Sequence, residues 1–383
     1  MKKFLICLSF FKGLSTRCFC VFFESSAISP FPPCDALLPC AVALSVIDRA
    51  VSADARSIKK GNHDESLGSF VKRRLGREAL ERVAQPLVGG IYTADPDHLS
   101  LTATLPRFRE MERRHRSLIL ALWRASRRDR GQASGASGAR WSLFVTFAEG
   151  MEEVVRILAE RLPQGSIRLK ESVVAVEPRG PGWIVRLSDR SAIEADSVIL
   201  GTPAYRAARL VRSLDPTLAH FLEAIMYASS VTVTLAYRRG DIVHPLDGFG
   251  FVVPREEGRS LLACTFSSVK YPGRAPEGYA LLRCFLGGTL GETVIAEDDA
   301  RLLSLVSSHL EALLGIAGRP LLTRVHRHPS AMAQYQVGHL DRVAAIERRL
   351  ADHPGLYLAG SAYLGVGIAD CVRSGEEAAI QAL

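Results

Sequence analysis

Two glycines near the end of the chain have the type and spacing to bind a ligand through the backbone. Gly365 and Gly367 flank Val366, directly before a segment whose apolar residues follow helical spacing. Glycines at such a turn let backbone N–H groups approach a ligand closely, and the positive end of the helix dipole favours negative charge there. The turn predicts a site for an anion, a phosphate or an electron-rich ring edge, although glycines that serve only tight packing are the commoner case.

A strand and a helix must position this turn. Residues 356–359 are an apolar run typical of a short buried strand, which ends at Gly360. After the turn, Ile368, Val372 and Leu383 belong to an apolar pattern that suits a helix packed on a sheet. The predicted order is therefore strand, glycine turn, helix.

Composition sets broad limits on the class of protein. The length of 383 residues allows two or three modest domains, and 48% apolar residues is ordinary for a globular protein. The net charge is +8, and many arginines lie between Lys72 and Arg140. That excess indicates an anionic substrate, an anionic membrane surface or simply a solvated basic face. The cysteines form neither a metal-type pattern nor a disulfide framework in the body of the chain, so we expect a reducing cytoplasm. Separately, we expect no nucleic-acid partner.

The whole stretch around the glycine turn, AGSAYLGVGIADCVRSGEEAA, closely resembles the C-terminal flavin-binding signature of protoporphyrinogen oxidases. The resemblance implies FAD as cofactor, with the helix N-terminus facing the pyrimidine edge of the flavin. It places Gly360 near the ribityl and pyrophosphate part of FAD, and Val366, Gly367 and Ile368 along the ring.

A β-meander is predicted in the middle of the chain. Strand patterns occur at 167–169, 173–176 and 183–187, after a strand-like run at 141–147 and a helix from Gly150. By resemblance to flavin oxidases of this superfamily, Val173 holds the adenine through its backbone. The residues alone favour plain strand core for Val173.

A second, antiparallel sheet is predicted from about residue 228 to 327, covered by a helix at 298–314. Its phrases PLDGFGFVVP and CTFSSVKYPGRAPEG resemble the substrate domain of protoporphyrinogen oxidases. The resemblance implies a flat apolar slot for a tetrapyrrole, with Val252 and Phe266 sandwiching its rings. Ordinary sheet core is the alternative for Phe266.

A helical domain precedes these sheets. Asp64 or Ser66 can cap a helix over SFVKRRLG, and a second helix leads into QPLVGGIY. The order of these features resembles the helical domain of the same family, which lies under the substrate tunnel and contributes to membrane association. The resemblance therefore leaves open a peripheral contact with the membrane.

The front of the chain departs from the family pattern. Dinucleotide-binding flavoproteins of this type begin with a strand, Gly-x-Gly-x-x-Gly and a helix, and no such motif precedes Gly131. A Cys- and Pro-rich leader stands in its place, and we expect it to be disordered or non-native.

These observations predict an α/β fold, α+β overall, that is a truncated version of the FAD-binding flavin amine oxidase-like fold. The predicted segments are an atypical leader at 1–63, a helical domain at 64–145, an FAD-domain meander at 146–205, an antiparallel-sheet substrate domain at 206–340, and a C-terminal FAD-binding segment at 341–383.

Two functions remain open. The first is FAD-dependent oxidation of protoporphyrinogen IX or coproporphyrinogen III by oxygen in haem synthesis. The second is a truncated, catalytically inactive homologue that acts as a porphyrin-binding or interaction module. A cytoplasmic location, peripheral on the membrane or not, and a homodimer are compatible with either.

Overall fold

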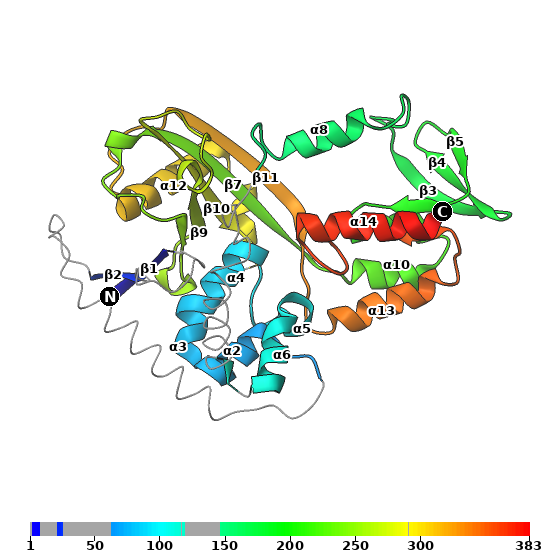
Figure 1. Ribbon diagram of the computed structural model, residues 1–383, viewed down its shortest axis with the longest axis horizontal. Coiled ribbons are helices and arrows are strands. Elements are labelled where there is room, and N and C mark those ends of the chain that lie inside the picture. The colour runs from blue at the N-terminus through cyan, green and yellow to red at the C-terminus, as the bar shows by residue number, and fades with distance from the viewer. Residues whose placement is uncertain (1, 8–20, 26–62, 116, 119–145, 290) are drawn as a thin grey trace, which may run out of the picture. The chain divides into compact units, whose positions relative to one another are not determined.

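The computed structural model describes residues 2–7, 21–25, 63–115, 117–118, 146–289 and 291–383, shown as coloured ribbon in Figure 1. The chain divides into two compact units. Unit 1 comprises residues 1–148 and 228–330, and unit 2 comprises residues 149–227 and 331–383. This division places the predicted helical segment with most of the predicted substrate sheet, and the predicted meander with the C-terminal segment.

Unit 1 is built on a seven-stranded sheet with the order β11-β7-β10-β9-β8-β1-β2. The strands are β1 (Lys2–Cys7), β2 (Val21–Ser25), β7 (Tyr227–Arg238), β8 (Gly250–Val252), β9 (Leu261–Phe266), β10 (Tyr279–Gly287) and β11 (Leu322–Ala333). The second sheet expected from period-two patterning between about 228 and 327 is confirmed.

Strands β1 and β2 lie within the leader that we expected to be disordered or non-native. They form an antiparallel hairpin, and β1 extends the sheet by pairing Ile6 with Val252 and Cys7 with Phe251. The expectation of disorder is corrected for these two stretches, because the neighbouring edge of β8 supplies a hydrogen-bonding partner. Apart from His63, the rest of the leader lies outside the described residues.

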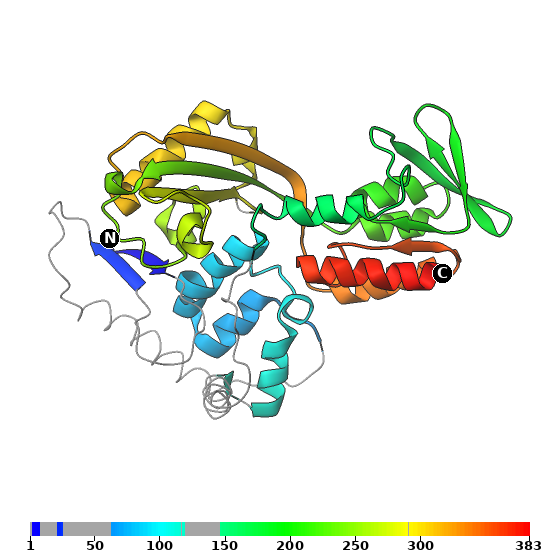
Figure 2. The same ribbon diagram turned by 45° about the horizontal axis from the view of Figure 1, so that its top comes forward.

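One face of this sheet carries the main core of the unit. Helix α12 (Asp299–Leu314) lies along it, gold in Figure 2, and buries Leu302, Val306 and Leu310 at helical spacing. Asp298 caps the helix by accepting a hydrogen bond of 2.7 Å from Arg301 N. The helix predicted at 298–314 is therefore confirmed.

The opposite face is covered by the helical part of unit 1. Its helices are α2 (Leu67–Leu75), α3 (Arg77–Ala79), the π-turn η1 (Leu80–Ala84), α4 (Gln85–Tyr92), α5 (Leu101–Thr104) and α6 (Pro106–His115). Ser66 is the side chain that caps α2, since it accepts a bond of 3.1 Å from Ser69 N. Helix α4 packs on the sheet closely enough that a Cβ at Gly90 would lie 3.4 Å from Val252 Cγ1.

Part of the arginine excess is neutralised inside this helical layer. Arg73 donates to Glu65 and Glu112 at 2.8 and 2.7 Å, and the side chain of Arg74, 3.7 Å from Glu112, is fully buried. Buried charges need such partners because burial removes them from water. These arginines are therefore structural, and only the remaining basic residues can meet an anionic surface.

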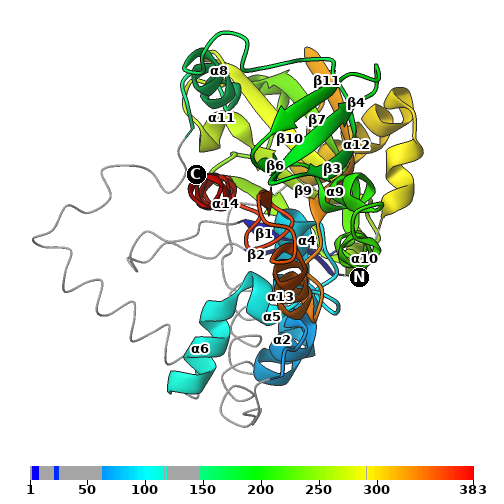
Figure 3. The ribbon, with the colours of Figure 1, turned by 90° about the vertical axis from the view of Figure 1, so that its right-hand side faces the viewer.

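Unit 2 combines an antiparallel meander with a short parallel pair. The meander is β3 (Val173–Arg179), β4 (Gly182–Leu187) and β5 (Ala192–Ala195), and the parallel pair is β6 (Val198–Leu200) with β12 (Leu356–Leu358). Its helices are α8 (Glu152–Glu160), α9 (Ala204–Val211), α10 (Pro216–Glu223), α13 (His339–Leu350) and α14 (Ile368–Ala382). Helices α13 and α14 run alongside each other, horizontally in Figure 1 and end-on in Figure 3.

Two of the strands predicted near this unit are not found among the described residues. The strand predicted at 167–169 is wrong, because these residues have no partner strand and their apolar side chains are exposed. Of the run predicted at 141–147, residues 141–145 lie outside the described residues, and 146 and 147 are not in a strand.

A buried carboxylate joins α10 to α13. Asp215 Oδ1 caps α10 by accepting from Thr217 N and Leu218 N at 3.0 and 2.9 Å. Its Oδ2 accepts from Arg349 at 2.8 Å and lies 3.1 Å from His353 Nε2. Burial alone would raise the pKa of Asp215, but the Leu218 N–H, His353 and Arg349 together hold it below the usual value. Asp215 is therefore charged at neutral pH and links two helices.

In the described part of the chain, no helix has both the length and the apolar character needed to cross a bilayer.

Candidate functional site

The predicted strand, glycine turn and helix are all present in unit 2. Strand β12 ends before Gly360, whose φ of +118° lies in the region that favours glycine. Gly360 N donates to Ser374 Oγ of α14 at 3.1 Å, which ties the end of the strand to the helix. Nothing lies within 4 Å of a Cβ built at Gly360, so this end of the strand is open to a neighbouring group.

Gly365 serves the turn itself and offers no donor to a ligand. Its N–H donates to Tyr335 Oη at 2.8 Å, and Tyr335 Oη in turn donates to Ser361 O at 2.9 Å. A Cβ at Gly365 would lie 2.5 Å from the Asp370 side chain, so only glycine fits. The expectation that both glycines present N–H groups to a ligand is therefore corrected for Gly365, since a tyrosine distant in sequence occupies its donor.

The N-terminus of α14 is the part of the turn that can meet an anion. Gly367 precedes the helix without a side-chain cap, and no described residue accepts a hydrogen bond from the N–H groups of Ile368 and Ala369. These groups carry the positive end of the helix dipole. Ile368 is 62% exposed and Val366 is half-buried, so both border this end. Asp370 also lies in the first turn, paired with Arg373.

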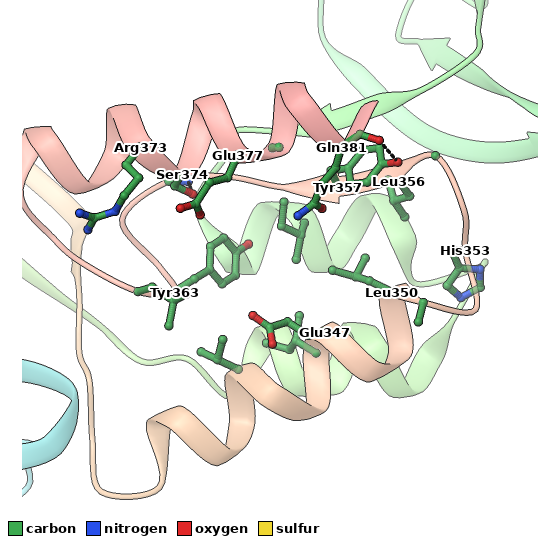
Figure 4. A pocket seen from close by; sticks show the side chains of 18 of the residues that line it. Glu347, Leu350, His353, Leu356, Tyr357, Tyr363, Arg373, Ser374, Glu377 and Gln381 are labelled. Atoms are coloured by element: carbon green, nitrogen blue, oxygen red, sulfur yellow. Dashed lines mark hydrogen bonds between the residues drawn. The ribbon is translucent and has the colours of Figure 1, made fainter. Parts of the chain in front are cut away.

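A cavity of about 760 Å³ lies behind the turn, between α13, β12 and α14 (Figure 4). Gly360 and Gly365 are on its border, and apolar side chains such as Leu350 and Leu356 form part of its wall. Tyr363 points into it in Figure 4, near Glu347 and Glu377. The wall of the cavity therefore combines apolar side chains with polar and charged ones.

Two tyrosines at this site stay protonated. Burial raises the pKa of Tyr335 and of Tyr363 well above the usual value, although the hydrogen bond from Gly365 N opposes this at Tyr335. His339 stacks on Tyr335 with ring centroids 4.0 Å apart, and its Nε2 lies 2.8 Å from Tyr363 O. That nitrogen must carry the hydrogen, because a carbonyl oxygen can only accept. Tyr335 and His339 therefore tie the turn to the segment at the start of α13.

The residues present fit one half of FAD. The open N-terminus of α14, the exposed apolar side chains beside it and the open end of β12 suit the ring side of a flavin, where negative charge develops on reduction. The pyrophosphate side normally needs Gly-x-Gly-x-x-Gly after a strand, and the sequence contains no such motif before Gly131. Val366, Gly367 and Ile368 are the residues that would hold the ring side, and Gly360 would lie toward the ribityl and pyrophosphate part.

Val173 opens β3 and is 39% exposed, so its backbone is at a strand end as expected. Its predicted contact with adenine stays a prediction.

The structure does not bring Val252 and Phe266 together. In the β8–β9 pair, Val252 faces Ala263 and packs under α4 with Leu87. Phe266 is 1% exposed and belongs to the core on the other face of the sheet. Because side chains alternate across a strand, the two cannot sandwich one ring from these positions. Their individual contacts with substrate stay predictions.

Sequence reasoning missed Tyr335, His339 and Tyr363. They lie in the segment 331–339 and in the turn itself, where they show no periodicity that could have marked them. Their role depends on the close approach of chain segments separated by about 25 to 30 residues.

Comparison with known proteins gives consistent results. A family model described as flavin containing amine oxidoreductase matches residues 35–383. Coproporphyrinogen III oxidase of Bacillus subtilis (strain 168) is 33% identical over 326 residues, which cover 85% of this chain and 68% of that protein. Protoporphyrinogen oxidase of Macaca fascicularis is 30% identical over 334 residues, covering 84% of this chain and 69% of the relative.

A solved structure is also similar. A protein from Exiguobacterium sp. 255-15, described as a proposed protoporphyrinogen oxidase, superposes with a TM-score of 0.76 at 30% identity and covers 90% of this chain and 73% of that one. This chain spans about two thirds of the length of the curated relatives that it matches. The mixed α/β, flavin amine oxidase-like fold expected from the sequence is confirmed. The chain therefore belongs to the flavin-containing amine oxidoreductases, among the coproporphyrinogen and protoporphyrinogen oxidases, a family of enzymes whose cofactor is FAD.

Proposed function

We propose that this protein takes part in the FAD-dependent oxidation of a porphyrinogen, protoporphyrinogen IX or coproporphyrinogen III, with oxygen as the final electron acceptor. The relatives' names support a porphyrinogen as substrate. The observation that carries the proposal is the N-terminus of α14, where unpaired N–H groups face open space beside the turn that Tyr335 fixes.

The proposed oxidation needs little acid–base catalysis from the protein. FAD, held by Val366, Gly367 and Ile368 on its ring side, would supply the two-electron oxidation of the macrocycle, with oxygen as the final electron acceptor. The chain's own part is positioning and electrostatics. The dipole of α14 stabilises negative charge at the ring edge by roughly 0.3–1 kcal/mol for an exposed helix end. Tyr335 holds Gly365, and so keeps this helix end in one orientation.

The test is to titrate the purified protein with FAD, to record its visible spectrum, and to follow porphyrin fluorescence with each porphyrinogen under air. Gly365→Ala should abolish flavin binding, since its new Cβ would collide with Asp370. Gly375→Ala is the control, because Gly375 lies in the helix that follows the turn and nothing lies within 4 Å of its added Cβ. Equal flavin occupancy in the two variants would show that the turn does not hold the cofactor.

The second candidate is a catalytically inactive homologue that binds porphyrin or another protein. The missing Gly-x-Gly-x-x-Gly favours it, because the pyrophosphate of FAD then has no glycine-rich turn in this chain. Absence of flavin bands after addition of FAD, together with saturable quenching of porphyrin fluorescence, would establish this function in place of the first.

We further propose a cytoplasmic location, peripheral contact with the membrane through the helical part of unit 1, and a homodimer. The basic residues left outside the buried Arg73–Glu112 network support the membrane contact. Cosedimentation with vesicles containing anionic phosphatidylserine, compared with neutral vesicles, tests that contact. Sedimentation velocity tests the dimer.

A further inference from the structure

The face of the unit 1 sheet that points away from α12 is only partly covered by helices. The helical layer meets it at β8 and β9, where Leu87 packs against Val252 and Ala263. Phe285 of β10 is half-buried and packs against the same group, so it stands at the border of the covered area. Beyond this border, β10, β7 and β11 lie next to one another (Figure 1). The face therefore has an apolar part under α4 and a less covered part across β10, β7 and β11.

Three basic side chains share the less covered part. Arg283 lies in β10 between two residues of the core under α12, so strand alternation points it to the opposite face. In β11, Val325 packs against that core, so His326 and His328 point to the same face as Arg283. All three side chains are exposed. We call Arg283, His326 and His328 the basic cluster.

The register of the strands brings the cluster within reach of one small ligand. Arg283 pairs with Thr234 of β7, and His328 Nε2 lies 3.3 Å from Thr232 Oγ1 of the same strand. Strands β10 and β11 flank β7, so they are about 10 Å apart, a gap that a long arginine side chain can largely span. A carboxylate placed over the two threonines can therefore contact the guanidinium on one side and an imidazole on the other.

The cluster has no negative partner in the described part of the chain. Arg327, the residue between the two histidines, points toward α12, and its Nη1 donates to Asp299 Oδ1 at 2.6 Å. In contrast, no described residue forms an ion pair with Arg283, His326 or His328. One side of β11 is thus neutralised and the other is not. Unneutralised charge of one sign attracts ions of the opposite sign.

The titration of His328 agrees with this arrangement. Burial lowers the pKa of His328, and His326 of its own strand and Arg283 of β10 lower it further. The side chains of β7 between them are threonines, which carry no charge. His328 is therefore mostly neutral at pH 7 in the chain alone. A carboxylate bound at the cluster would favour the protonated imidazole, so binding would take up a proton.

The neighbouring apolar surface defines the class of ligand. A ligand that contacts both parts of the face is a largely apolar ring system with a carboxylate at its rim, and arginine suits a carboxylate because its fork matches both oxygens. We propose that Arg283, His326 and His328 bind a propionate carboxylate of the porphyrinogen, with the macrocycle on the side of Phe285. The identity of the carboxylate as a propionate rests on the proposed function, whereas the anion-binding cluster does not.

The test measures binding of coproporphyrin III and of its tetramethyl ester to the full chain without FAD, by porphyrin fluorescence in one detergent-containing buffer. Arg283→Gln should weaken binding of the acid about tenfold and leave binding of the ester unchanged. Arg283→Lys keeps the charge and should retain most of the affinity. Arg301→Gln is the matched control, because it changes the net charge equally but lies exposed on α12, at the other face of the sheet.

A second variant reports on the histidines. Calorimetry of coproporphyrin III binding at pH 7 in phosphate and in Tris buffer should give different heats, because these buffers differ in the heat of releasing a proton. His328→Gln should reduce this difference, since its side chain takes up no proton. A purely structural role of His328 would leave the proton uptake unchanged.

Three results would overturn the inference: equal affinity of the Arg283→Gln and Arg301→Gln variants for the acid, binding of the ester as tight as that of the acid, or unchanged proton uptake in His328→Gln. Cluster-dependent binding of the acid, without oxidation of either porphyrinogen when FAD is added, would contradict the proposed function and leave the inference standing. Oxidation of a porphyrinogen with unaltered binding in Arg283→Gln would do the reverse.

Discussion

The two units of this protein differ in how completely they bury their apolar side chains. In unit 1 the sheet and α12 enclose a continuous core in which Val233, Leu282 and Leu310 are fully buried. In unit 2 several elements keep large apolar side chains in solvent, namely Val155, Leu158, Leu162, Leu364, Ile368, Val372 and Ile380. Unit 1 also exposes some apolar side chains, such as Val243, so the units differ in the size of the enclosed core and not in a complete absence of exposed apolar surface.

The polar groups show the same contrast. Arg74, the most deeply buried charge of unit 1, lies beside Glu112, and Arg73 bridges Glu112 and Glu65. Among the described residues of unit 2, the hydroxyl of Tyr363 is buried without a partner and the outer edge of β12 is open. Unit 1 also holds a buried polar atom with no partner among the described residues, His309 Nε2, so the contrast in polar groups is one of degree.

Removing the buried carboxylate of unit 2 should have the largest effect on stability. Asp215→Ala deletes the cap of α10 and the charged hydrogen bonds that join Asp215 to Arg349 and His353, which we expect to cost about 3–5 kcal/mol in total. The folded pKa of Asp215 is lowered, so its contribution is fully present above the unfolded pKa and is lost as the pH falls through the folded one. Urea unfolding at several pH values between 7 and 3 measures the loss in the free energy of unfolding. Hydrogen–deuterium exchange in α10 shows whether the loss is local to that helix. Asp189→Ala, on an exposed turn, is the control. An equal loss of stability in the Asp215→Ala and Asp189→Ala variants would contradict the prediction.

Truncation of a core side chain in unit 1 should lower the free energy of unfolding by about the same amount as Asp215→Ala, or by somewhat less. Phe266 packs against Phe251 and His244 in the main core, so Phe266→Ala should lower the free energy of unfolding by about 3–5 kcal/mol. Exposed Phe147→Ala is the control. If Phe266→Ala left stability unchanged but weakened porphyrin binding, Phe266 would line the substrate slot, as the sequence resemblance implied.

A smaller loss is expected at the glycine turn. Tyr335→Phe leaves the Gly365 N–H without its acceptor and Ser361 O without its donor, at a cost of about 1–3 kcal/mol that should be confined to unit 2. Faster hydrogen–deuterium exchange over residues 361–371 is the readout. Tyr357→Phe is the control. It removes a hydroxyl that donates to Gln381 O near the C-terminal end of α14, so hydrogen–deuterium exchange over residues 361–371 should stay unchanged.

The smallest effect should come from the exposed stripe of α8. Leu158→Ser should change the free energy of unfolding of the isolated chain by no more than about 0.5 kcal/mol, because the Leu158 side chain is exposed and buries little apolar surface. The substitution should also improve solubility. A loss of several kcal/mol, measured by urea unfolding next to Leu310→Ala of unit 1, would show that unit 2 is already covered and would remove the contrast between the units.

Much of the secondary structure could be predicted from local patterns. The alternation in Val231, Val233 and Leu235 and the helical spacing in α12 come from burial on one side, which marks the sequence directly. The strand expected at 167–169 failed because a strand pattern does not reveal whether a partner exists. The domain boundaries predicted at 145, 205 and 340 stay a prediction, since the two structural units are each built from separated parts of the chain.

The sequence by itself determined the strand, the glycine turn and the helix of the flavin-side signature, because glycine conformation and amphipathic spacing are local properties of the chain. Only the tertiary structure decided that Gly365 bonds Tyr335, that Val252 and Phe266 lie on opposite faces, and that Tyr363 points into the cavity beside β12. These relations depend on which distant segments meet, and hydrogen bonds and packing between segments leave no periodic mark in the sequence.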